Sequence, residues 1–507
     1  MMKMKSTTAL SASRIPVISL LAASAGCVST TQETRAPGPV AGSIDKPNIV
    51  IIFTDDQGYA DLGCFGSTKI KTPHIDRMAK EGCRFTNFMV GSPVCSPSRA
   101  ALLTGCYPKR VGMHKGVLFP DSKIGLNPDE YTIADHLKGQ GYATACFGKW
   151  HLGHHQETLP TRNGFDEYYG IPYSNDMNHP DDTKKMEGGK LLWSKPDLLW
   201  KDQESAVTQW NTPMVEGDEI IECPTDQRTV TRRYTDKAID FIKSNETRNK
   251  EQGTKNPFFI YLPHSMPHVP LYVPEDSYDP DPTNAYTCVI EHIDAETGRL
   301  LDTLRELGLD KNTYVIFTSD NGPWTYLGHH AGSAGPLRGH KAQTYEGGMR
   351  VPCVVWAPGR IPAGTECDQL ATTLDLLPTI AALTHSDIPK DRKIDGVDIS
   401  GLLADPTMRT PREEFLYYSS KGNLDGIRQD NWKLLKRQKH RRKGEPKVEG
   451  PPKFDIMLFD LPNDIGEQSN LAEEKPELVK ALTQRMEELD AEVERNGRAP
   501  WRESREP

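Results

Sequence analysis

Acidic and amide side chains stand at the ends of two apolar segments of this sequence. Asp55 and Asp56 follow the run IVIIFT, and Asp320 and Asn321 follow TYVIFTS. If both runs are strands of one open α/β sheet, these side chains lie beyond the carboxyl ends, where such sheets bind ligands. Carboxylate and amide oxygens suit a hard divalent cation, calcium or magnesium, better than zinc. The alternative is that each pair only begins a turn, because Asp and Asn favour turns.

Basic and imidazole side chains follow two further apolar runs. Lys149 and His151 in GKWHLG lie two residues apart, so in an extended chain they point to the same side. A cation beside an imidazole indicates anion binding with proton transfer. His264 and His268 lie in PHSMPHVP, whose prolines would hold both rings at low entropy cost. The alternative for the second segment is a proline-rich surface turn.

The segment LRGHKAQTYEGGMRVP, residues 337–352, combines a double glycine with basic residues. Gly347-Gly348 allows a positive φ or a close backbone approach. Lys341, with Arg338 and Arg350, could hold an anion there. An ordinary glycine turn flanked by solvated charges is the alternative.

Cys95 stands in GSPVCSPSRAALLTG, two residues before Pro97 and four before Arg99. Its neighbours are too polar for a core cysteine, and no Cys or His lies at metal-ligand spacing. Cys27 aside, the other cysteines are scattered singly without a CxxC pair, so zinc-ribbon and redox motifs are excluded. Disulfides are permitted if the chain is exported, but the sequence leaves their pairing open.

The elements that must position these residues alternate between strand and helix patterns. Buried strands are predicted at IVIIFTDD, 142–148, 258–263, 313–320 and 351–358. Helices are predicted at IDRMAKEG, SRAALLTG, YTIADHLKGQG, 286–308 and 370–384, the last containing Pro378. This alternation predicts an α/β fold with a large, mostly parallel central sheet flanked by helices.

The C-terminal part has a different pattern. The short runs EFLYYSS, DGIRQ, NWKLLKR and MLFDL predict a small antiparallel sheet, and 476–497 predicts an amphipathic helix beside it. We therefore expect a catalytic domain at 47–405 and an α+β subdomain at 406–507.

The N-terminus carries an export signal. Lys3, Lys5 and Arg14 precede the apolar run IPVISLLAASAG, which is too short to span a bilayer as a mature helix. Residues 1–27 are predicted to be a signal peptide, either simply cleaved or of the lipoprotein type with a lipid anchor on Cys27. Residues 28–46, rich in Thr, Pro, Ser and Gly, would form a tether. We expect a periplasmic, outer-membrane-anchored or secreted protein.

Charge excludes one class of partner. The 507-residue chain has a formal net charge of −9 and no long basic stripe, so nucleic acid is not expected to bind. The basic cluster at 433–443 is predicted to be a solvated loop, and a rim that attracts a polyanionic substrate is the alternative. Nothing in the sequence predicts the oligomeric state.

In combination these motifs resemble a known family. Cys95-Ser96-Pro97-Ser98-Arg99 with AALLTG behind it resembles the signature of the type I sulfatases, part of the alkaline phosphatase superfamily. GKWHLG, FTDDQG, TSDNG and KxxxYEGGxRVP also match, in the expected order, between about residues 47 and 480. GIPYSND at 170–176 and the tail LFDL…NLAE look most like the arylsulfatase A and N-acetylgalactosamine-6-sulfatase group.

The resemblance implies a modified nucleophile beside a metal ion. Cys95 would be oxidised to Cα-formylglycine by a formylglycine-generating enzyme that reads Pro97 and Arg99. One calcium ion, or magnesium, would be held by Asp55, Asp56, Asp320, Asn321 and the modified Cys95.

It also implies the remaining roles. A hydroxyl of the hydrated aldehyde would attack sulfur while Asp320 accepts its proton, and Arg99, Lys149 and Lys341 would offset the charge. His268, with Lys341, would contact sulfate and assist the leaving oxygen, and His151 would deprotonate the second hydroxyl. Ser174 matches a position that contacts sulfate, and His264 would lie further out.

Two other functions stay open. A phosphonate or phosphate monoester hydrolase of the same superfamily can carry the same aldehyde. An inactive glycan-binding homologue is the second, although the full set of matching residues speaks against it. For a sulfatase, the expected substrate is a sulfated polysaccharide of the galactose or N-acetylgalactosamine type.

Overall fold

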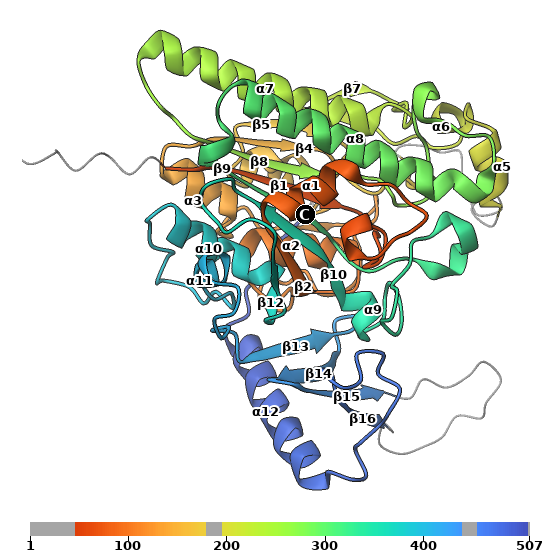
Figure 1. Cartoon of the computed structure of the whole chain (residues 1–507), viewed down its shortest axis with the longest axis vertical. Coiled ribbons are helices and arrows are strands. Elements are labelled where there is room, and N and C mark those ends of the chain that lie inside the picture. Colours follow the sequence, from red (N-terminus) through yellow and green to blue (C-terminus); the bar gives the residue numbers. More distant parts are fainter. Residues whose placement is uncertain (1–45, 179–194, 439–453, 505–507) are drawn as a thin grey trace, which may run out of the picture. The chain divides into compact units, whose positions relative to one another are not determined.

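The computed structural model of the chain describes residues 46–178, 195–438 and 454–504, which belong to one compact unit (Figure 1). The predicted signal peptide and, except for Lys46, the predicted tether lie outside the described residues. The domain boundary near residue 405 stays a prediction.

Eleven of the described strands form a large mixed sheet. In order across the sheet these are β11 (Thr365–Cys367), β2 (Cys83–Met89), β10 (Arg350–Trp356), β9 (Thr313–Ser319), β1 (Asn48–Thr54), β8 (Phe258–Pro263), β4 (Ala143–Phe147), β5 (Glu167–Gly170), β6 (Met214–Glu216) and β7 (Glu219–Glu222), and β12 (Ala371–Thr372) also pairs with β2. The run from β9 through β1, β8 and β4 to β5 is parallel. The predicted mostly parallel sheet is confirmed, although β10 runs antiparallel to both of its neighbours.

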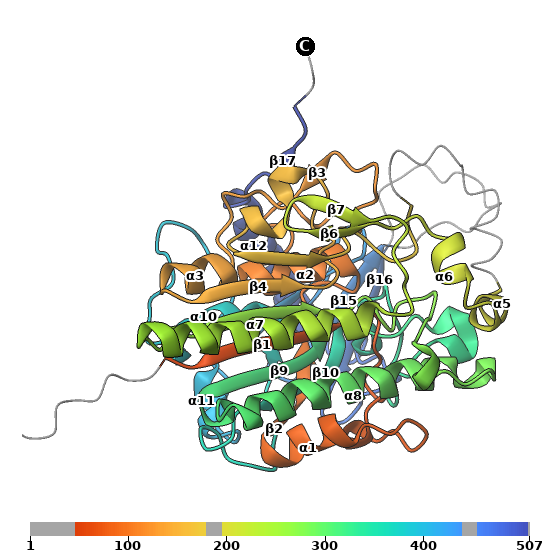
Figure 2. The ribbon, with the colours of Figure 1, turned by 90° about the horizontal axis from the view of Figure 1, so that it is seen from above.

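Helices cover both faces of this sheet (Figure 2). In β1, Ile49, Ile51 and Phe53 pack with α2 (Cys95–Thr104), α3 (Ile133–Gly139) and α10 (Leu376–Leu383). Val50 and Ile52 pack on the other face with α1 (Pro73–Glu81), α7 (Val230–Gln252) and α8 (Ala285–Glu306). Successive strand residues point to opposite faces, so a strand buried on both sides carries a continuous apolar run, as residues 49–53 of β1 do.

Two features of the chain differ from the sequence prediction. The helix predicted over 370–384 begins only at Leu376, after β12 and a 3₁₀ turn at Thr373–Asp375. Pro378 therefore lies in the first helical turn, where its missing N–H leaves no hydrogen bond unmade. The long helix α7 was not predicted, although Val230, Tyr234 and Ala238 recur every fourth residue along its buried face.

The C-terminal part forms the predicted antiparallel sheet, from β13 (Glu414–Tyr418), β14 (Leu424–Gln429), β15 (Trp432–Gln438) and β16 (Phe454–Asp460). Helix α12 (Pro476–Arg495) buries Leu482, Met486 and Val493. The solvated loop predicted at 433–443 is wrong over 433–438, which belong to β15, and residues 439–443 lie outside the described residues. Lys433 is fully buried between Glu346 and Glu467.

The remaining described helices are short. They include α5 (Pro196–Lys201), α6 (Ser205–Thr208), α9 (Glu346–Met349), α11 (Ser400–Ala404) and the 3₁₀ segment η7 (Thr325–His330), and a small ribbon pairs β3 (Ile124–Gly125) with β17 (Trp501–Arg502). Apart from Cys95, free thiols are found at Cys64, Cys83, Cys106, Cys146, Cys288, Cys353 and Cys367.

Candidate active site

The two oxygen-bearing pairs meet where β1 and β9 end. These strands are parallel neighbours with Thr54 opposite Ser319, so Asp55 and Asp320 begin their loops side by side. The backbone N–H of Asp56 donates to Asp320 Oδ1 at 3.1 Å, and Asn321 Nδ2 donates to Asp56 Oδ1 at 2.7 Å. All four side chains are buried.

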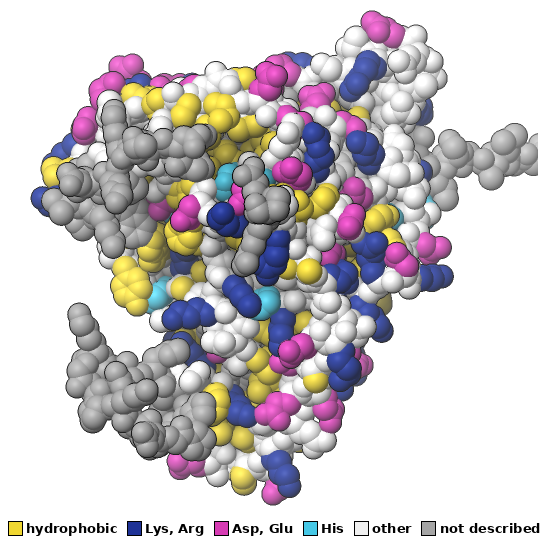
Figure 3. Space-filling view, turned by 180° about the vertical axis from the view of Figure 1, so that it is seen from behind, with side chains coloured by type: hydrophobic (Ala, Val, Ile, Leu, Met, Phe, Trp, Pro, Cys, Tyr) yellow, Lys and Arg dark blue, Asp and Glu magenta, His cyan; other side chains and the backbone are white. Residues whose placement is uncertain are grey.

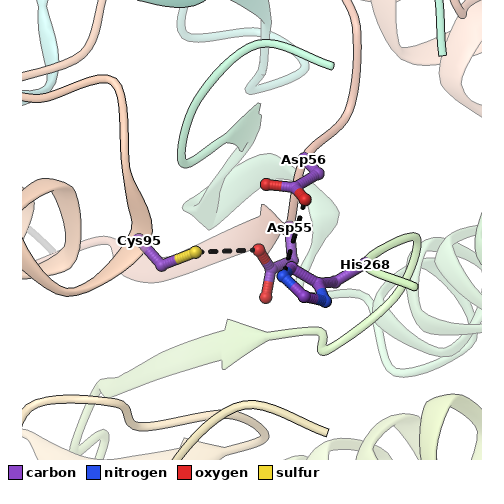
Figure 4. A group of neighbouring side chains, drawn as sticks. All are labelled: Asp55, Asp56, Cys95 and His268. Atoms are coloured by element: carbon purple, nitrogen blue, oxygen red, sulfur yellow. Dashed lines mark hydrogen bonds and ion pairs between the residues drawn. The ribbon is translucent and has the colours of Figure 1, made fainter. Parts of the chain in front are cut away.

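Cys95 reaches this cluster from the first residue of helix α2. Val94 before it is extended, so the helix starts at the cysteine itself. Cys95 Sγ lies 3.3 Å from Asp55 Oδ1 and is buried. Figure 4 shows Cys95, Asp55, Asp56 and His268 converging, and one ligand atom from each lies within 4.8 Å of the others.

Three cationic side chains neutralise the carboxylates. Arg99, one turn after Cys95, bonds Asp320 Oδ2 at 2.8 Å and lies 3.3 Å from Asp55 Oδ2. Lys149, after β4, pairs with Asp55, and Lys341 Nζ lies 2.7 Å from Asp56 Oδ2.

Burial and neighbouring charges shift the pKa values of Asp55 and Asp320 in different directions. Burial by itself raises a carboxyl pKa, but Lys149, His268 and Arg99 hold the pKa of Asp55 well below its usual range. Burial, with the charge of Asp55 next to it, raises the pKa of Asp320. A further cation near Asp320 would favour its charged form.

His151 is held through a backbone carbonyl. Its Nε2 lies 2.8 Å from the carbonyl oxygen of Leu118, and the N–H of Leu118 donates to Ser96 Oγ at 3.0 Å. A carbonyl only accepts, so the proton sits on Nε2 and Nδ1 keeps its lone pair. Nδ1 is buried with no hydrogen-bond partner among the described residues. Burial and the charges of Lys149 and Arg99 lower the pKa of His151 well below its ordinary value, so the ring is a neutral base.

His268 joins the cluster but His264 does not. His268 Nε2 lies 3.6 Å from Asp56 Oδ2, and Nδ1 lies 2.7 Å from the carbonyl oxygen of Val269. Its ring lies 5.7 Å from the indole of Trp324, which also carries Lys341 Nζ 4.6 Å above its ring centre. His264 is buried beside Tyr234, and both of its ring nitrogens lack a hydrogen-bond partner within the described chain.

Ser174 and the double glycine complete the surroundings. Lys149 Nζ donates to Ser174 Oγ at 3.0 Å. A Cβ at Gly347 or Gly348 would stand 2.5 Å or 2.1 Å from the carbonyl oxygens of Gly339 and Gln343, so the close approach, not a positive φ, requires glycine there.

Of the basic residues in that segment, Lys341 alone pairs with the cluster. Arg338 donates a hydrogen bond to the backbone carbonyl of Glu467, and Arg350 donates one to the backbone carbonyl of Thr86. The expectation that Arg338 and Arg350 help to hold an anion is therefore not met.

The donor set fits a hard divalent cation. Asn321 Oδ1 is buried and has no hydrogen-bond partner among the described residues, although its own Nδ2 bonds Asp56 and Gly322. A buried carbonyl oxygen without a partner is costly unless something binds it. With the oxygens of Asp55, Asp56 and Asp320 around it, calcium or magnesium would satisfy it.

Sequence reasoning missed three residues that support this site. Trp324 packs against Lys341 and His268. The only sequence feature that could have indicated it is its position directly after the run TSDNGP. Ser96 and Leu118 hold His151, and no local signal marks that pairing because 22 residues separate them.

Fold and site together indicate an enzyme of the α/β class that acts on anionic esters, and comparison with known proteins gives its family. The sulfatase family model matches residues 47–386, and the model of the N-sulphoglucosamine sulphohydrolase C-terminal region matches 340–492. The chain belongs to the sulfatase family, whose members are sulfuric ester hydrolases. The family predicted from the motifs is confirmed.

Curated relatives agree with this assignment. The chain is 34% identical to arylsulfatase G of Rattus norvegicus over 90% of its length and 86% of the relative's. It is 36% identical to arylsulfatase A of Homo sapiens, covering 86% of each, and 37% identical to N-acetylgalactosamine-6-sulfatase of Sus scrofa, covering 71% of this chain and 66% of the relative.

Solved structures share the fold. The sulfatase PsFucS1 from Pseudoalteromonas sp. superposes with a TM-score of 0.73 at 26% identity, over 90% of this chain and 92% of that one. Ps i-CgsB in complex with k-i-k-neocarrahexaose superposes with a TM-score of 0.68 at 28% sequence identity, over 88% of this chain and 92% of that one. The phosphonate monoester hydrolase of Agrobacterium radiobacter superposes with a TM-score of 0.55 at 18% sequence identity, over 88% of this chain and 96% of that one. This similarity shows the common fold alone.

Proposed function

We propose that this enzyme hydrolyses sulfate monoesters of a sulfated glycan through a formylglycine made from Cys95, with one calcium ion bound beside it. The observation that carries the proposal is the position of Cys95. Its Sγ stands at the start of a helix, 3.3 Å from Asp55, inside a buried cluster of carboxylates and cations. Burial and the charges of Asp320 and Asp55 raise the pKa of its thiol well above the ordinary value, so it is not a working thiolate.

The groups around position 95 have different proposed roles. The hydrated aldehyde would supply a hydroxyl nucleophile, and a cation held by Asp55, Asp56, Asp320 and Asn321 would stabilise negative charge on the sulfate oxygens. Arg99, Lys149 and Lys341 fix positive charge where the transferring group carries negative charge. Asp320 accepts a proton on its carboxylate, and His151 accepts another at Nδ1.

The leaving oxygen would face a separate pair. His268 Nε2 and Lys341 Nζ lie together against Trp324 and Asp56. Lys341 can donate a hydrogen bond, and His268 Nε2 can donate one only from the protonated ring, because the proton of the neutral ring is on Nδ1, which faces the carbonyl of Val269. Ser174, bonded to Lys149, would position a sulfate oxygen.

Substrate class is inferred from the relatives and from charge. The similarity to N-acetylgalactosamine-6-sulfatase favours a sulfated N-acetylgalactosamine or galactose unit, and the neocarrahexaose-bound structure supports a saccharide substrate. Figure 3 shows a face on which Lys, Arg and His side chains gather near the centre. Positive charge at a surface raises the local concentration of an anionic substrate.

Export and maturation follow from the same proposal. A formylglycine-generating enzyme would act on Cys95 before the chain folds, because the folded site buries it. The predicted signal peptide would deliver the enzyme to the periplasm, the outer membrane or the exterior, with or without a lipid on Cys27. Of the helices in the described ranges, none has the length and apolar character that crossing a membrane requires.

The first test is the mass of the segment 91–105 in purified, matured protein. Conversion of Cys95 to formylglycine lowers that mass by about 18 Da. We expect Cys95→Ala to abolish sulfate release, and Cys288→Ala, at a half-buried free thiol, to preserve it. Full sulfate-releasing activity in Cys95→Ala would refute the chemistry.

A second test decides between the two ester classes. We expect kcat/KM for an aryl sulfate to exceed that for the matching aryl phosphate. The reverse order would favour the phosphonate or phosphate monoester hydrolase. A panel of sulfated galactose and N-acetylgalactosamine saccharides then identifies the sugar.

A further inference from the structure

A second group of metal-ligand side chains lies outside the active site. Asp197 is in the first turn of α5, and His329 and His330 end the 3₁₀ segment η7. His329 Nε2 lies 2.8 Å and His330 Nε2 3.0 Å from the same oxygen, Asp197 Oδ1. All three ligand atoms fall within 4.8 Å of one another. Segments more than 130 residues apart in the chain thus present two imidazoles and a carboxylate to one point.

The backbone allows two consecutive histidines to face the same point. Gly328 before them has φ 59° and ψ −124°, a conformation that breaks the 3₁₀ turn and that L side chains rarely adopt. A Cβ there would meet nothing within 4 Å, so the glycine serves the bend rather than close packing. The His329 and His330 ring centres lie 4.9 Å apart.

The exposure of the three side chains suits a site that is fixed at one end and open at the other. The side chain of His330 is 1% exposed, whereas those of His329 and Asp197 are 40% and 48% exposed. His330 also lines a small cavity with Leu199, Leu327 and Val269. The buried ring is therefore held by packing, and an ion can enter from the open side.

We propose that Asp197, His329 and His330 bind a divalent transition metal ion of the zinc type. Two imidazole nitrogens and one carboxylate oxygen are a common three-ligand set for zinc, with water completing the tetrahedron. Ligand atoms in such a site lie about 3.3 Å apart when the bonds are about 2.0 Å. The observed distances to Asp197 Oδ1 need to lengthen by only a few tenths of an ångström. The active site, built mainly from oxygens, favours calcium instead.

Such an ion would stabilise the segments that lie beside the active site. It would tie α5 to η7, which directly follows Trp324, the residue beneath Lys341 and His268. The cavity beside His330 is lined by Val269 and Pro270, which follow His268. The proposal does not depend on the formylglycine chemistry.

The test is zinc binding to the full, calcium-saturated protein after transition metals have been stripped. Isothermal titration should show saturable binding of zinc in addition to calcium. Binding should weaken at least tenfold in Asp197→Asn and in His329→Asn, and zinc should raise the Tm of the unaltered protein by about 2 °C but not that of these variants. Both altered side chains are partly exposed, so the variants are expected to fold.

Two controls separate this site from others. His385→Asn changes an exposed histidine with φ 54°, a conformation that Asn tolerates, and should leave zinc binding unchanged. His268→Asn removes an imidazole from the active-site cluster and should also leave it unchanged. The proposal is overturned if zinc does not bind, if Asp197→Asn binds as tightly as the unaltered protein, or if His268→Asn alone abolishes binding.

Discussion

Arg99 shows how tightly single residues are coupled in this site. Its guanidinium is fully buried, bonds Asp320 and lies beside Asp55, and donates to the carbonyl of Lys149 at 2.9 Å. Burial disfavours its charge, but the two carboxylates raise its pKa, so the charge is permanent. One side chain thus links the ends of β1, β4 and β9 to helix α2.

Ser96 is expected to act on catalysis through His151. Ser96→Ala removes the acceptor for the N–H of Leu118, whose carbonyl holds His151 Nε2. We expect kcat to fall tenfold or more, since a well-placed general base accelerates the reaction by about 10²–10⁴-fold. The Leu118 carbonyl favours the charged ring, so loosening it lowers the pKa of His151 further and moves the acid limb of the pH profile of kcat to lower pH.

The matched control is Ser98→Ala on the same helix. Ser98 is equally buried, and its Oγ has no hydrogen-bond partner in the described structure. The peptide mass of 91–105 must show the same maturation in both variants. Equal kcat in Ser96→Ala and Ser98→Ala would refute the positioning role.

Removal of the proposed calcium ion should expose the repulsion between the carboxylates. We expect a calcium chelator to abolish activity and lower the Tm, because Asp55, Asp56 and Asp320 then face one another with less positive charge. Calcium should restore both. Asn321→Leu removes the unpartnered Oδ1 and should weaken calcium binding at least tenfold by titration. Unchanged calcium affinity in that variant would place the ion elsewhere.

At the scale of elements, the site is a set of short loops that leave parallel strands. Gly148 follows β4 with φ 140°, and an added Cβ would stand 2.0 Å from the carbonyl oxygen of Pro263. The same carbonyl oxygen accepts a hydrogen bond from the backbone N–H of Lys149, with an N···O distance of 2.7 Å. The turn that delivers Lys149 and His151 therefore depends on a glycine against the end of β8.

Gly148→Ala should displace this loop. A shift of about 1 Å in catalytic groups can cost about 10²-fold in rate, so we expect kcat to fall by at least that factor. Gly253→Ala, at the end of α7, is the control, because its φ is 64° and a Cβ there meets open space. It should cost about 1–2 kcal/mol of stability without changing kcat. Similar kcat in the two variants would contradict the argument.

At the scale of the whole molecule, a buried ion triad joins the C-terminal sheet to the catalytic part. Lys433 Nζ in β15 lies 2.9 Å from a carboxylate oxygen of Glu346 and 2.9 Å from one of Glu467. Glu346 begins α9, a few residues after Lys341. The C-terminal sheet therefore supports the segment that brings Lys341 to Asp56.

Lys433→Ala would leave two buried carboxylates without their cation. We expect a loss of about 3–5 kcal/mol in the free energy of unfolding, measured by denaturant titration. Lys436→Ala, which removes a partly exposed pair with Glu487, should cost less than about 1 kcal/mol. Equal losses would show that the triad does not hold the two parts together.

The fold was largely predictable because hydrophobic periodicity is a local signal. β1, β9 and α12 follow directly from their apolar spacing. The division of 370–384 was not predictable, because pairing of Ala371–Thr372 with β2 overrides the helical pattern. The antiparallel direction of β10 is likewise set by its neighbours.

The sequence by itself determined which chemical groups are available: acids after apolar strands, the CSPSR motif, and the lysine and imidazole of GKWHLG. Only the tertiary structure decided that Lys341 enters the cluster while Arg338 turns away, and that Leu118 holds His151. Residue types fix which reactions are possible. Contacts between distant segments fix which groups meet, and these depend on strand register and packing that one sequence does not display.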